Sequence, residues 1–148
     1  MNEAFKKLSD TQLMALALYG EARGESTKGK IAVGSIILER VDHRDWNGKT
    51  IHGVCLKPKQ FSCFNEKDPN RVRLEFIANN WDAAMSANIA LNDCFCIALG
   101  LIQGNIPRTP EIAENHATQY LRVDCDAPWE KKMRKVATIG KHDFLTEA

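Results

Sequence analysis

The chain has 148 residues, of which 26% are charged, and its formal net charge is +1. This length suits one domain that buries roughly two thirds of the surface of its unfolded chain. The balanced charge excludes the global field of a general binder of nucleic acids or membrane surfaces. No apolar run reaches the roughly 18 residues of a membrane span, and no apolar signal region follows the N-terminus. We therefore expect a single domain over residues 1–148, made in the cytoplasm without a signal peptide and without membrane insertion.

The first predicted helix begins at Ser9, because residues 9–12, Ser-Asp-Thr-Gln, have the form of a capping box before an apolar run. The run is apolar on most of its circumference as far as Tyr19, so we expect a buried helix with Gly24 as its stop. Steps of four along its inner face lead to Glu21. A carboxylate at the inner end of a buried helix is costly unless it is paired, solvated or protonated.

A second helix is predicted over residues 26–41, although its β-branched residues leave a strand as the alternative. Residues 42–49 are polar and indicate a loop with a tight turn at Asn47-Gly48. Thr50 is placed to cap a short helix that continues to Leu56. Residues 57–70 predict an irregular loop or a small hairpin.

Residues 71–104 return to a helical pattern, which we expect to divide at Asn92-Asp93 and to end at Gly104. After it we predict a loop over residues 105–110, an extended segment over 115–123 and a turn over 124–128. Two helical turns over residues 129–135 and a hairpin over 136–145, broken near Gly140, complete the chain. The predicted fold class is therefore α+β, mainly α, with a small β element near the C-terminus.

Glu21 and Glu25 are the first candidates for catalysis, because residues four apart on a helix have β-carbons about 5 to 6 Å apart. A buried or paired carboxyl with a raised pKa suits a general acid that protonates a glycosidic oxygen. The alternative is that Arg23 and nearby lysines neutralise two surface glutamates, and the spacing alone favours this simpler interpretation.

Two further groups of residues are candidates for ligand binding. Gln60, Phe61, Ser62 and Tyr120 are neutral hydrogen-bonding and aromatic groups that suit an N-acetylated sugar. The basic residues near the C-terminus, Lys131, Lys132, Arg134, Lys135 and Lys141, are more typical of a solvated face than of a nucleic-acid site.

The five cysteines are an odd number at irregular spacings, which indicates reduced thiols. Cys94 and Cys96, even together with His116 and Cys125, lack the paired-ligand pattern of a zinc site. We therefore predict no metal and no cofactor. A nucleophilic pair of cysteine and histidine stays open, although no local feature singles out one thiol.

Ordered motifs along the chain resemble those of the SleB-like cell wall hydrolase family, which comprises spore-cortex-lytic enzymes and phage relatives. The matching segments are residues 19–25 (Tyr-Gly-Glu-Ala-Arg-Gly-Glu), 29–41, 60–64 (Gln-Phe-Ser-Cys-Phe), 116–120 (His-Ala-Thr-Gln-Tyr), Trp129 and 139–144 (Ile-Gly-Lys-His-Asp-Phe). Because these matches cover almost the whole chain in order, the resemblance outweighs the interpretation of the two glutamates as surface charges.

The resemblance implies a lysozyme-like fold, similar to lytic transglycosylases, and cleavage of peptidoglycan between N-acetylmuramic acid and N-acetylglucosamine. It implies Glu21 as the general acid and base, and Glu25 as a supporting group or as a second catalytic carboxylate in a hydrolytic reaction. The residues that it implies for substrate binding are Tyr19, Arg23, Gln60, Phe61, Ser62, Thr118, Tyr120, Lys141 and His142.

Two departures from the family pattern imply a changed substrate preference: Glu39 stands where asparagine is common, and Gln119 where tyrosine or histidine is common. The expected setting is that of a monomeric, phage-type endolysin that is made in the host cytoplasm, depends on a holin for release and acts on peptidoglycan glycan strands. A lysin carried by the phage particle is the alternative setting. The alternatives are an N-acetylmuramoyl-L-alanine amidase, which usually requires zinc, and a peptidoglycan-binding module without catalysis.

Overall fold

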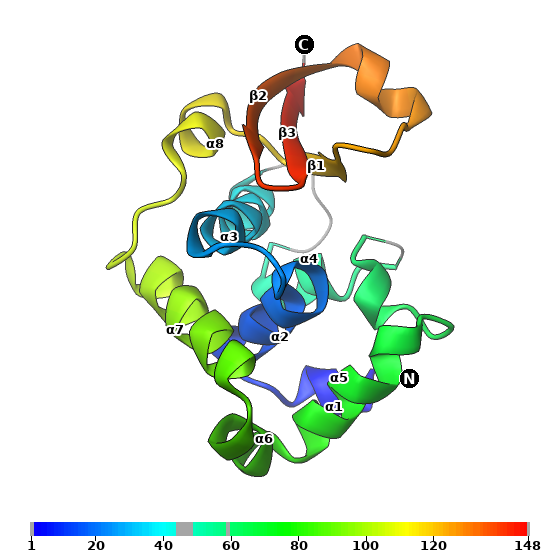
Figure 1. Ribbon diagram of the computed structural model, residues 1–148, viewed down its shortest axis with the longest axis vertical. Helices are drawn as coiled ribbons and strands as arrows, with labels where there is room; N and C mark the ends of the chain where they lie inside the picture. The colour runs from blue at the N-terminus through cyan, green and yellow to red at the C-terminus, as the bar shows by residue number, and fades with distance from the viewer. Residues whose placement is uncertain (1, 44–48, 59, 148) are drawn as a thin grey trace.

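The computed structural model describes residues 2–43, 49–58 and 60–147 and is mainly helical, with a three-stranded sheet at one end (Figure 1). The helices are α1 (Glu3–Lys6), α2 (Asp10–Ala22), α3 (Thr27–Asp42), α4 (Ile51–Cys55), α5 (Pro69–Asn79), α6 (Trp81–Ala87), α7 (Ile89–Gln103) and α8 (Pro110–Asn115). Two short 3-10 helices are η1 (Ser62–Phe64) and η2 (Pro128–Lys132), and the strands are β1 (Gln119–Arg122), β2 (Met133–Ile139) and β3 (His142–Glu147). The expected mainly helical α+β class with a C-terminal β element is confirmed.

Helix α2 begins as the sequence predicts, because Ser9 and Gln12 form both hydrogen bonds of the capping box. It ends at Ala22, two residues before the expected stop. Gly24 is outside the left-handed region that ends many helices. A tight turn closes α2 instead, with the Glu25 amide donating to the Ala22 carbonyl at 2.9 Å. This early end leaves room for the cap of the next helix.

Helix α3 confirms the helical prediction for residues 26–41, and the alternative of a strand is wrong. The hydroxyl of Ser26 accepts the Gly29 amide and starts the helix. Most of its side chains are buried, because α3 lies between the sheet and the helices α2 and α7 (Figure 1). An element covered on opposite sides carries apolar residues around most of its circumference, which explains its strand-like composition.

The segment after α3 follows the prediction in part. Thr50 accepts the Gly53 amide and caps α4, as expected, whereas the turn predicted at Asn47-Gly48 lies outside the described residues. Residues 62–64 form a 3-10 turn and Pro69 starts α5. An irregular loop therefore connects α4 and α5, and the alternative of a hairpin there is wrong.

The predicted division of residues 71–104 at Asn92 is wrong, because the helices break at Asn80 and Asn88. The side chain of Asn88 caps α7 by accepting the Leu91 amide, and Asn92 lies inside α7. Gly104 ends α7 in the left-handed conformation, as expected. No single helix in the described part of the chain could cross a membrane by length and composition, and α6 with α7 would reach that length only across a bend of 110°.

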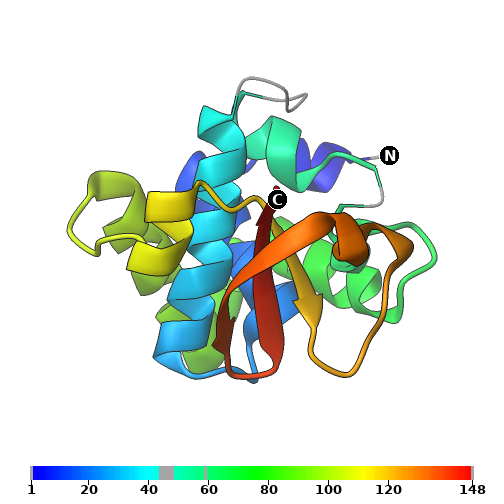
Figure 2. The same ribbon diagram turned by 90° about the horizontal axis from the view of Figure 1, so that it is seen from above.

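The sheet has the strand order β1-β3-β2, and both pairs are antiparallel. Gly140 turns β2 into β3 with a φ of +58°, which confirms the predicted hairpin. The extended segment is shorter than predicted, because β1 covers only Gln119–Arg122, and helix α8 before it was not predicted. The predicted helical turns end at Lys132, where β2 follows. Helix α8 lies beside β2, and both pack on the same side of α3 (Figure 1 and Figure 2).

Candidate functional site

The larger polar pocket, of about 470 Å³, opens where the end of α2 meets η1, β1 and η2. It is lined by Gly20, Glu21, Arg40, Gln60, Ser62, Gln119, Tyr120, Leu121, Arg122, Cys125, Trp129 and His142. Its lining combines amides, hydroxyls, an indole ring and one carboxyl group. Such a lining offers several hydrogen-bonding groups and an aromatic surface to a polyhydroxylated ligand.

Glu21 reaches this pocket from the last turn of α2, where Gly20 allows η1 to approach closely. A Cβ atom at position 20 would lie 2.6 Å from the sulfur of Cys63, a distance that real Cβ contacts do not show. The glycine therefore permits the close contact that brings Cys63 and Ser62 to the carboxyl group. The prediction that Glu21 lies at the inner end of a buried helix agrees with this placement.

The carboxyl group of Glu21 has neutral hydrogen-bond donors as its described partners. The Tyr120 hydroxyl donates to Glu21 Oε1 at 3.1 Å, and the Cys63 thiol also bonds to this carboxyl. Burial raises the pKa of Glu21, while these two donors and the charge of Arg40 act in the opposite direction. Burial dominates, so Glu21 keeps its proton to a higher pH than an exposed glutamate does.

Arg40 is a pocket residue that the sequence analysis missed. It comes from the buried face of α3, is 3% exposed, and donates from Nε to the Thr118 carbonyl at 2.7 Å. Its guanidinium group lies over the Phe61 ring, 5.2 Å from the centroid. Burial lowers the pKa of Arg40, and the nearby Glu21 and Tyr120 raise it. Arg40 belongs to the matching segment 29–41, and its place in that motif is a signal that could have identified it.

The residues predicted to contact a sugar divide into two groups. Gln60, Ser62 and Tyr120 line the pocket as expected. Phe61 and Thr118 do not, because Phe61 is 1% exposed beneath Arg40 and Thr118 is buried with its carbonyl bonded to Arg40. Both support the pocket wall from behind, which corrects their expected role as direct contacts.

Tyr19 and Arg23 also lie away from the two polar pockets around Glu21. Tyr19 is buried and accepts a hydrogen bond from Asn88 at 3.0 Å. Arg23 donates to the Tyr19 carbonyl and to Asn70, and its guanidinium group lies 4.9 Å from the centre of the Tyr19 ring. These contacts join α2 to α5 and α7, so the two residues take structural positions and not the expected substrate-binding ones.

A smaller pocket of about 150 Å³ adjoins the first and shares Glu21, Arg122 and His142 with it. Glu25 and Lys141 line it as well. The side chain of Glu25 is 9% exposed, and its Oε1 atom accepts the Lys141 amide at 2.9 Å and lies 3.4 Å from His142 Nδ1. The structure thus brings together four of the predicted residues, Glu21, Glu25, Lys141 and His142.

His142 and Tyr120 complete the wall between the pockets. Their rings meet edge to face with centroids 5.2 Å apart. Burial lowers the pKa of His142, and the carboxylate of Glu25 opposes that shift. A largely neutral imidazole at neutral pH follows from this balance.

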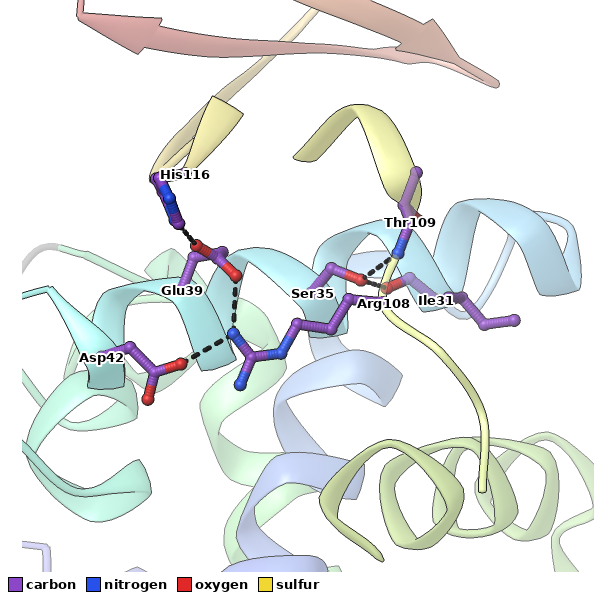
Figure 3. Close-up of polar contacts among 7 residues, drawn as sticks. All are labelled: Ile31, Ser35, Glu39, Asp42, Arg108, Thr109 and His116. Carbon is purple, nitrogen blue, oxygen red and sulfur yellow. Dashed lines mark hydrogen bonds and ion pairs between the residues drawn. The ribbon is translucent and has the colours of Figure 1, made fainter. Parts of the chain in front are cut away.

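Glu39 lies outside both polar pockets, in a separate cluster between α3 and the segment before β1 (Figure 3). Its side chain is 5% exposed and accepts from Arg108 at 2.6 Å and from His116 at 3.1 Å. Arg108 also bonds to Asp42 at 2.7 Å, and one turn earlier Ser35 accepts the Thr109 amide at 2.9 Å. Of the two departures from the family pattern, Glu39 therefore serves this cluster, whereas Gln119 lines the larger pocket.

The described side chains that could bind a metal ion lie apart from one another. Within residues 2–43, 49–58 and 60–147, no three side chains of His, Cys, Asp or Glu gather closely enough to hold a metal ion. Cys55, Cys63 and Cys94 are separate and buried, whereas Cys96 and Cys125 are exposed. Burial raises the pKa of the Cys55 thiol to about 12 and that of Cys94 to about 11, which disfavours the reactive thiolate at both.

Comparisons with known proteins found a matching family, similar sequences and similar structures. A family model described as Cell Wall Hydrolase matches residues 24–145. Similar relatives include the spore cortex-lytic enzyme of Oceanobacillus iheyensis, which is 36% identical over 86 residues, or 53% of this chain and 31% of the relative. The Bacillus cereus spore cortex-lytic enzyme is 35% identical over 86 residues, or 53% of this chain and 33% of the relative. The chain spans about a third of the length of these relatives.

Two solved structures resemble the fold over nearly its full length. The catalytic domain of the germination-specific lytic transglycosylase SleB from Bacillus anthracis matches with a TM-score of 0.63 and 26% identity, over 95% of this chain and 98% of that one. The catalytic domain of SleB from Bacillus cereus matches with a TM-score of 0.63 and 28% identity, over 93% and 89%. The expected family resemblance and fold are thereby confirmed.

Proposed function

The chain belongs to the cell wall hydrolase family, and from this premise we propose that it cleaves peptidoglycan glycan strands as a lytic transglycosylase, with Glu21 as the catalytic acid and base. One observation carries the proposal: Glu21 is half-buried in the wall of a polar pocket beside neutral donors, and this burial raises its pKa. The family match begins three residues after Glu21, so the choice of this residue depends on its position in the pocket.

The reaction requires one group that first gives and then takes a proton. Protonated Glu21 donates its proton to the glycosidic oxygen, the bond from C1 of N-acetylmuramic acid to that oxygen breaks, and an oxocarbenium-like centre forms. The carboxylate then removes the proton of the muramic 6-hydroxyl as this oxygen bonds to C1. The products are an anhydro sugar and a new end at N-acetylglucosamine, and Glu21 regains its proton. The Tyr120 donor stabilises the transient carboxylate.

The distribution of carboxyl groups favours this reaction over hydrolysis. Glu21 is the one acidic side chain among the described residues that line the larger pocket. Glycoside hydrolysis uses a pair of carboxyl groups on either side of the bond, whereas ring closure by the muramic hydroxyl needs one. Glu25 is engaged with the Lys141 amide in the smaller pocket. A pocket with one available carboxyl group therefore supports transglycosylation.

The pocket wall fits a glycan strand. Gln60, Ser62 and Gln119 supply amide and hydroxyl groups for N-acetyl and hydroxyl substituents. The Trp129 side chain, which is 39% exposed at the rim, can cover the apolar face of a sugar ring. These features support a carbohydrate substrate, with the residues named as its direct contacts.

Muropeptide mass spectrometry of purified sacculi tests the proposed activity. Digestion should release fragments with anhydro-muramic ends, and it should continue in the presence of a metal chelator. New reducing ends would show hydrolysis instead, and freed stem peptides with loss of activity in chelator would show an amidase. Sacculi that bind the protein without being cleaved would indicate a binding module.

The biological setting is part of the proposal. We propose that the protein acts as a monomeric, phage-type endolysin that is made in the host cytoplasm and reaches the wall through a holin. Co-expression with and without a holin tests this setting, because lysis should require both proteins. Lysis by the protein alone, or no lysis with both, would contradict the holin-dependent route.

A further inference from the structure

Glu25 is held in a way that differs from a free catalytic carboxylate. Its side chain crosses from the turn between α2 and α3 to the turn between β2 and β3, which is 115 to 117 residues further along the chain. There Oε1 accepts the Lys141 amide at 2.9 Å and lies 3.4 Å from His142 Nδ1. Glu25 Oε1 thus faces two consecutive residues, Lys141 in the turn and His142 at the start of β3.

The sequence of the turn between β2 and β3 is adapted to this contact. A Cβ atom at position 140 would lie 2.3 Å from Glu25 Oε1, and Gly140 also has a φ of +58°. Glycine is therefore required both for the left-handed conformation and for the approach of the carboxylate. At the other end, a Cβ atom at Gly29 would lie 3.0 Å from Cβ of Glu25, so the first turn of α3 also closes around this side chain.

The contact leads to the catalytic carboxyl group through two aromatic rings. His142 pairs with Arg122 across β1 and β3, and its ring meets the Tyr120 ring edge to face at 5.2 Å. The Tyr120 hydroxyl donates to Glu21 Oε1 at 3.1 Å. Glu25, His142, Tyr120 and Glu21 therefore form a continuous series of contacts from the turn to the reacting proton.

We propose that Glu25 is a positioning residue, which fixes the turn between β2 and β3 through the Lys141 amide and thereby holds His142 and Tyr120 in place against Glu21. This inference rests on the proposed function and assigns Glu25 no proton transfer of its own. Its action requires a hydrogen-bond acceptor at Oε1, not a negative charge. That distinction separates a positioning residue from a second catalytic carboxylate.

Two substitutions at the same position separate the roles. Glu25→Gln keeps an oxygen acceptor at the place of Oε1 and removes the charge, whereas Glu25→Ala removes both. We expect Glu25→Gln to keep kcat within about threefold of the parent protein, since a neutral amide oxygen can accept the Lys141 amide in place of the carboxylate oxygen. Glu25→Ala should lower kcat about 10² fold with KM changed less than about threefold, because a displaced catalytic group costs rate more than binding.

The matched controls lie on α8, where Glu114→Gln and Glu114→Ala change an exposed glutamate and should leave kcat unchanged. If Glu25→Gln were as inactive as Glu21→Gln, Glu25 would act through its charge and the inference would be overturned. The inference would also be overturned if Glu25→Ala kept full kcat, because the side chain of Glu25 would then not be needed to hold the catalytic groups in place.

Amide hydrogen exchange tests the contact without any activity. The Lys141 amide should be protected in the parent protein and in Glu25→Gln, and should exchange at least about tenfold faster in Glu25→Ala. An unprotected Lys141 amide in the parent protein would overturn the inference. A parent protein that protects this amide but releases no muropeptides would overturn the proposed function, and the positioning role with it, while the contact between Glu25 and the Lys141 amide would stand.

Discussion

Two glutamates, on the neighbouring helices α2 and α3, have opposite surroundings. Glu21 is half-buried and faces the hydroxyl of Tyr120 and the thiol of Cys63, both of them neutral, and its partial burial raises its pKa. Glu39 is more deeply buried and is bonded to the guanidinium group of Arg108 and to His116 (Figure 3). The carboxyl group of Glu21 lies at the larger polar pocket, whereas that of Glu39 joins α3 to the segment before β1.

The difference shows how the same residue type can serve chemistry or stability. A carboxylate that is paired with arginine is held in one position by a charge-assisted hydrogen bond and joins the two segments that carry the pair. A carboxyl group among neutral donors can change its charge at a small cost, because its partners suit both forms. The comparison therefore predicts that substitutions near Glu21 change activity, whereas substitutions near Glu39 change the free energy of unfolding.

The largest effect is expected for Glu21→Gln, which removes the transferable proton. Activity on sacculi should fall about 10³ fold, the usual scale for a general acid and base. Because the pKa of Glu21 is raised, the folded state holds this proton more tightly than the unfolded state, and stability declines as pH rises through the folded pKa. Glu21→Gln should therefore melt above the parent protein at pH 8, with a smaller difference at pH 4.

The control for this substitution is Glu39→Gln, which should retain most activity. Turbidity clearing of sacculi and differential scanning calorimetry measure the two properties. A strongly active Glu21→Gln variant, or an inactive but folded Glu39→Gln variant, would reverse the comparison.

A smaller effect is expected for Tyr120→Phe, which removes the hydroxyl that donates to Glu21. Loss of one hydrogen bond to a charged form costs about 1.5 kcal/mol, or about tenfold in rate. This hydrogen bond lowers the pKa of Glu21, so its removal should raise that pKa further and extend activity to higher pH. The pH dependence of kcat measures the shift of the alkaline limb.

Tyr19→Phe is the matched control, because it removes a hydroxyl that is bonded to Asn88 outside the pocket. It should leave the alkaline limb in place. An unchanged limb in Tyr120→Phe would mean that the described hydrogen bond does not influence the acid.

The smallest effect on activity is expected for Arg108→Ala, which leaves Glu39 buried with His116 as its described partner. Removal of one partner of a buried ion pair costs about 3 to 5 kcal/mol, and the partial exposure of Arg108 reduces the expected loss to about 2 kcal/mol. Urea unfolding measures this loss, while activity at a temperature well below the transition should stay within about twofold.

Adding Glu39→Gln to Arg108→Ala should recover part of the stability, since an uncharged amide is cheaper to bury. No recovery would contradict the electrostatic explanation.

Local signals predicted the ends of several elements. Ser9, Ser26 and Thr50 cap helices, and Gly104 and Gly140 adopt left-handed conformations, because each feature depends on a few neighbouring residues. The breaks within residues 71–104 were not predicted. Asparagine stands at positions 79, 80, 88 and 92, and only the packing of the helices decides at which of the four a helix ends.

The site was predicted in part for similar reasons. Glu21 follows from its position on the inner face of a helix, and Tyr120 and His142 came from motifs. Arg40 lies in a helix that is buried almost all round, so periodicity could not indicate the side on which it reaches a pocket. Tyr19 and Phe61 look like ligand contacts in sequence, yet long-range packing buries both.

Glu39 and Arg40 are consecutive residues of α3, and they serve the two compared regions from adjacent positions. Each residue of an α-helix advances the side-chain direction by about 100°. An insertion or deletion of one residue earlier in α3 would turn Arg40 away from the pocket and Glu39 away from Arg108 at once. During divergence of the family, this helix should therefore tolerate exchanges of residue type more readily than changes of length.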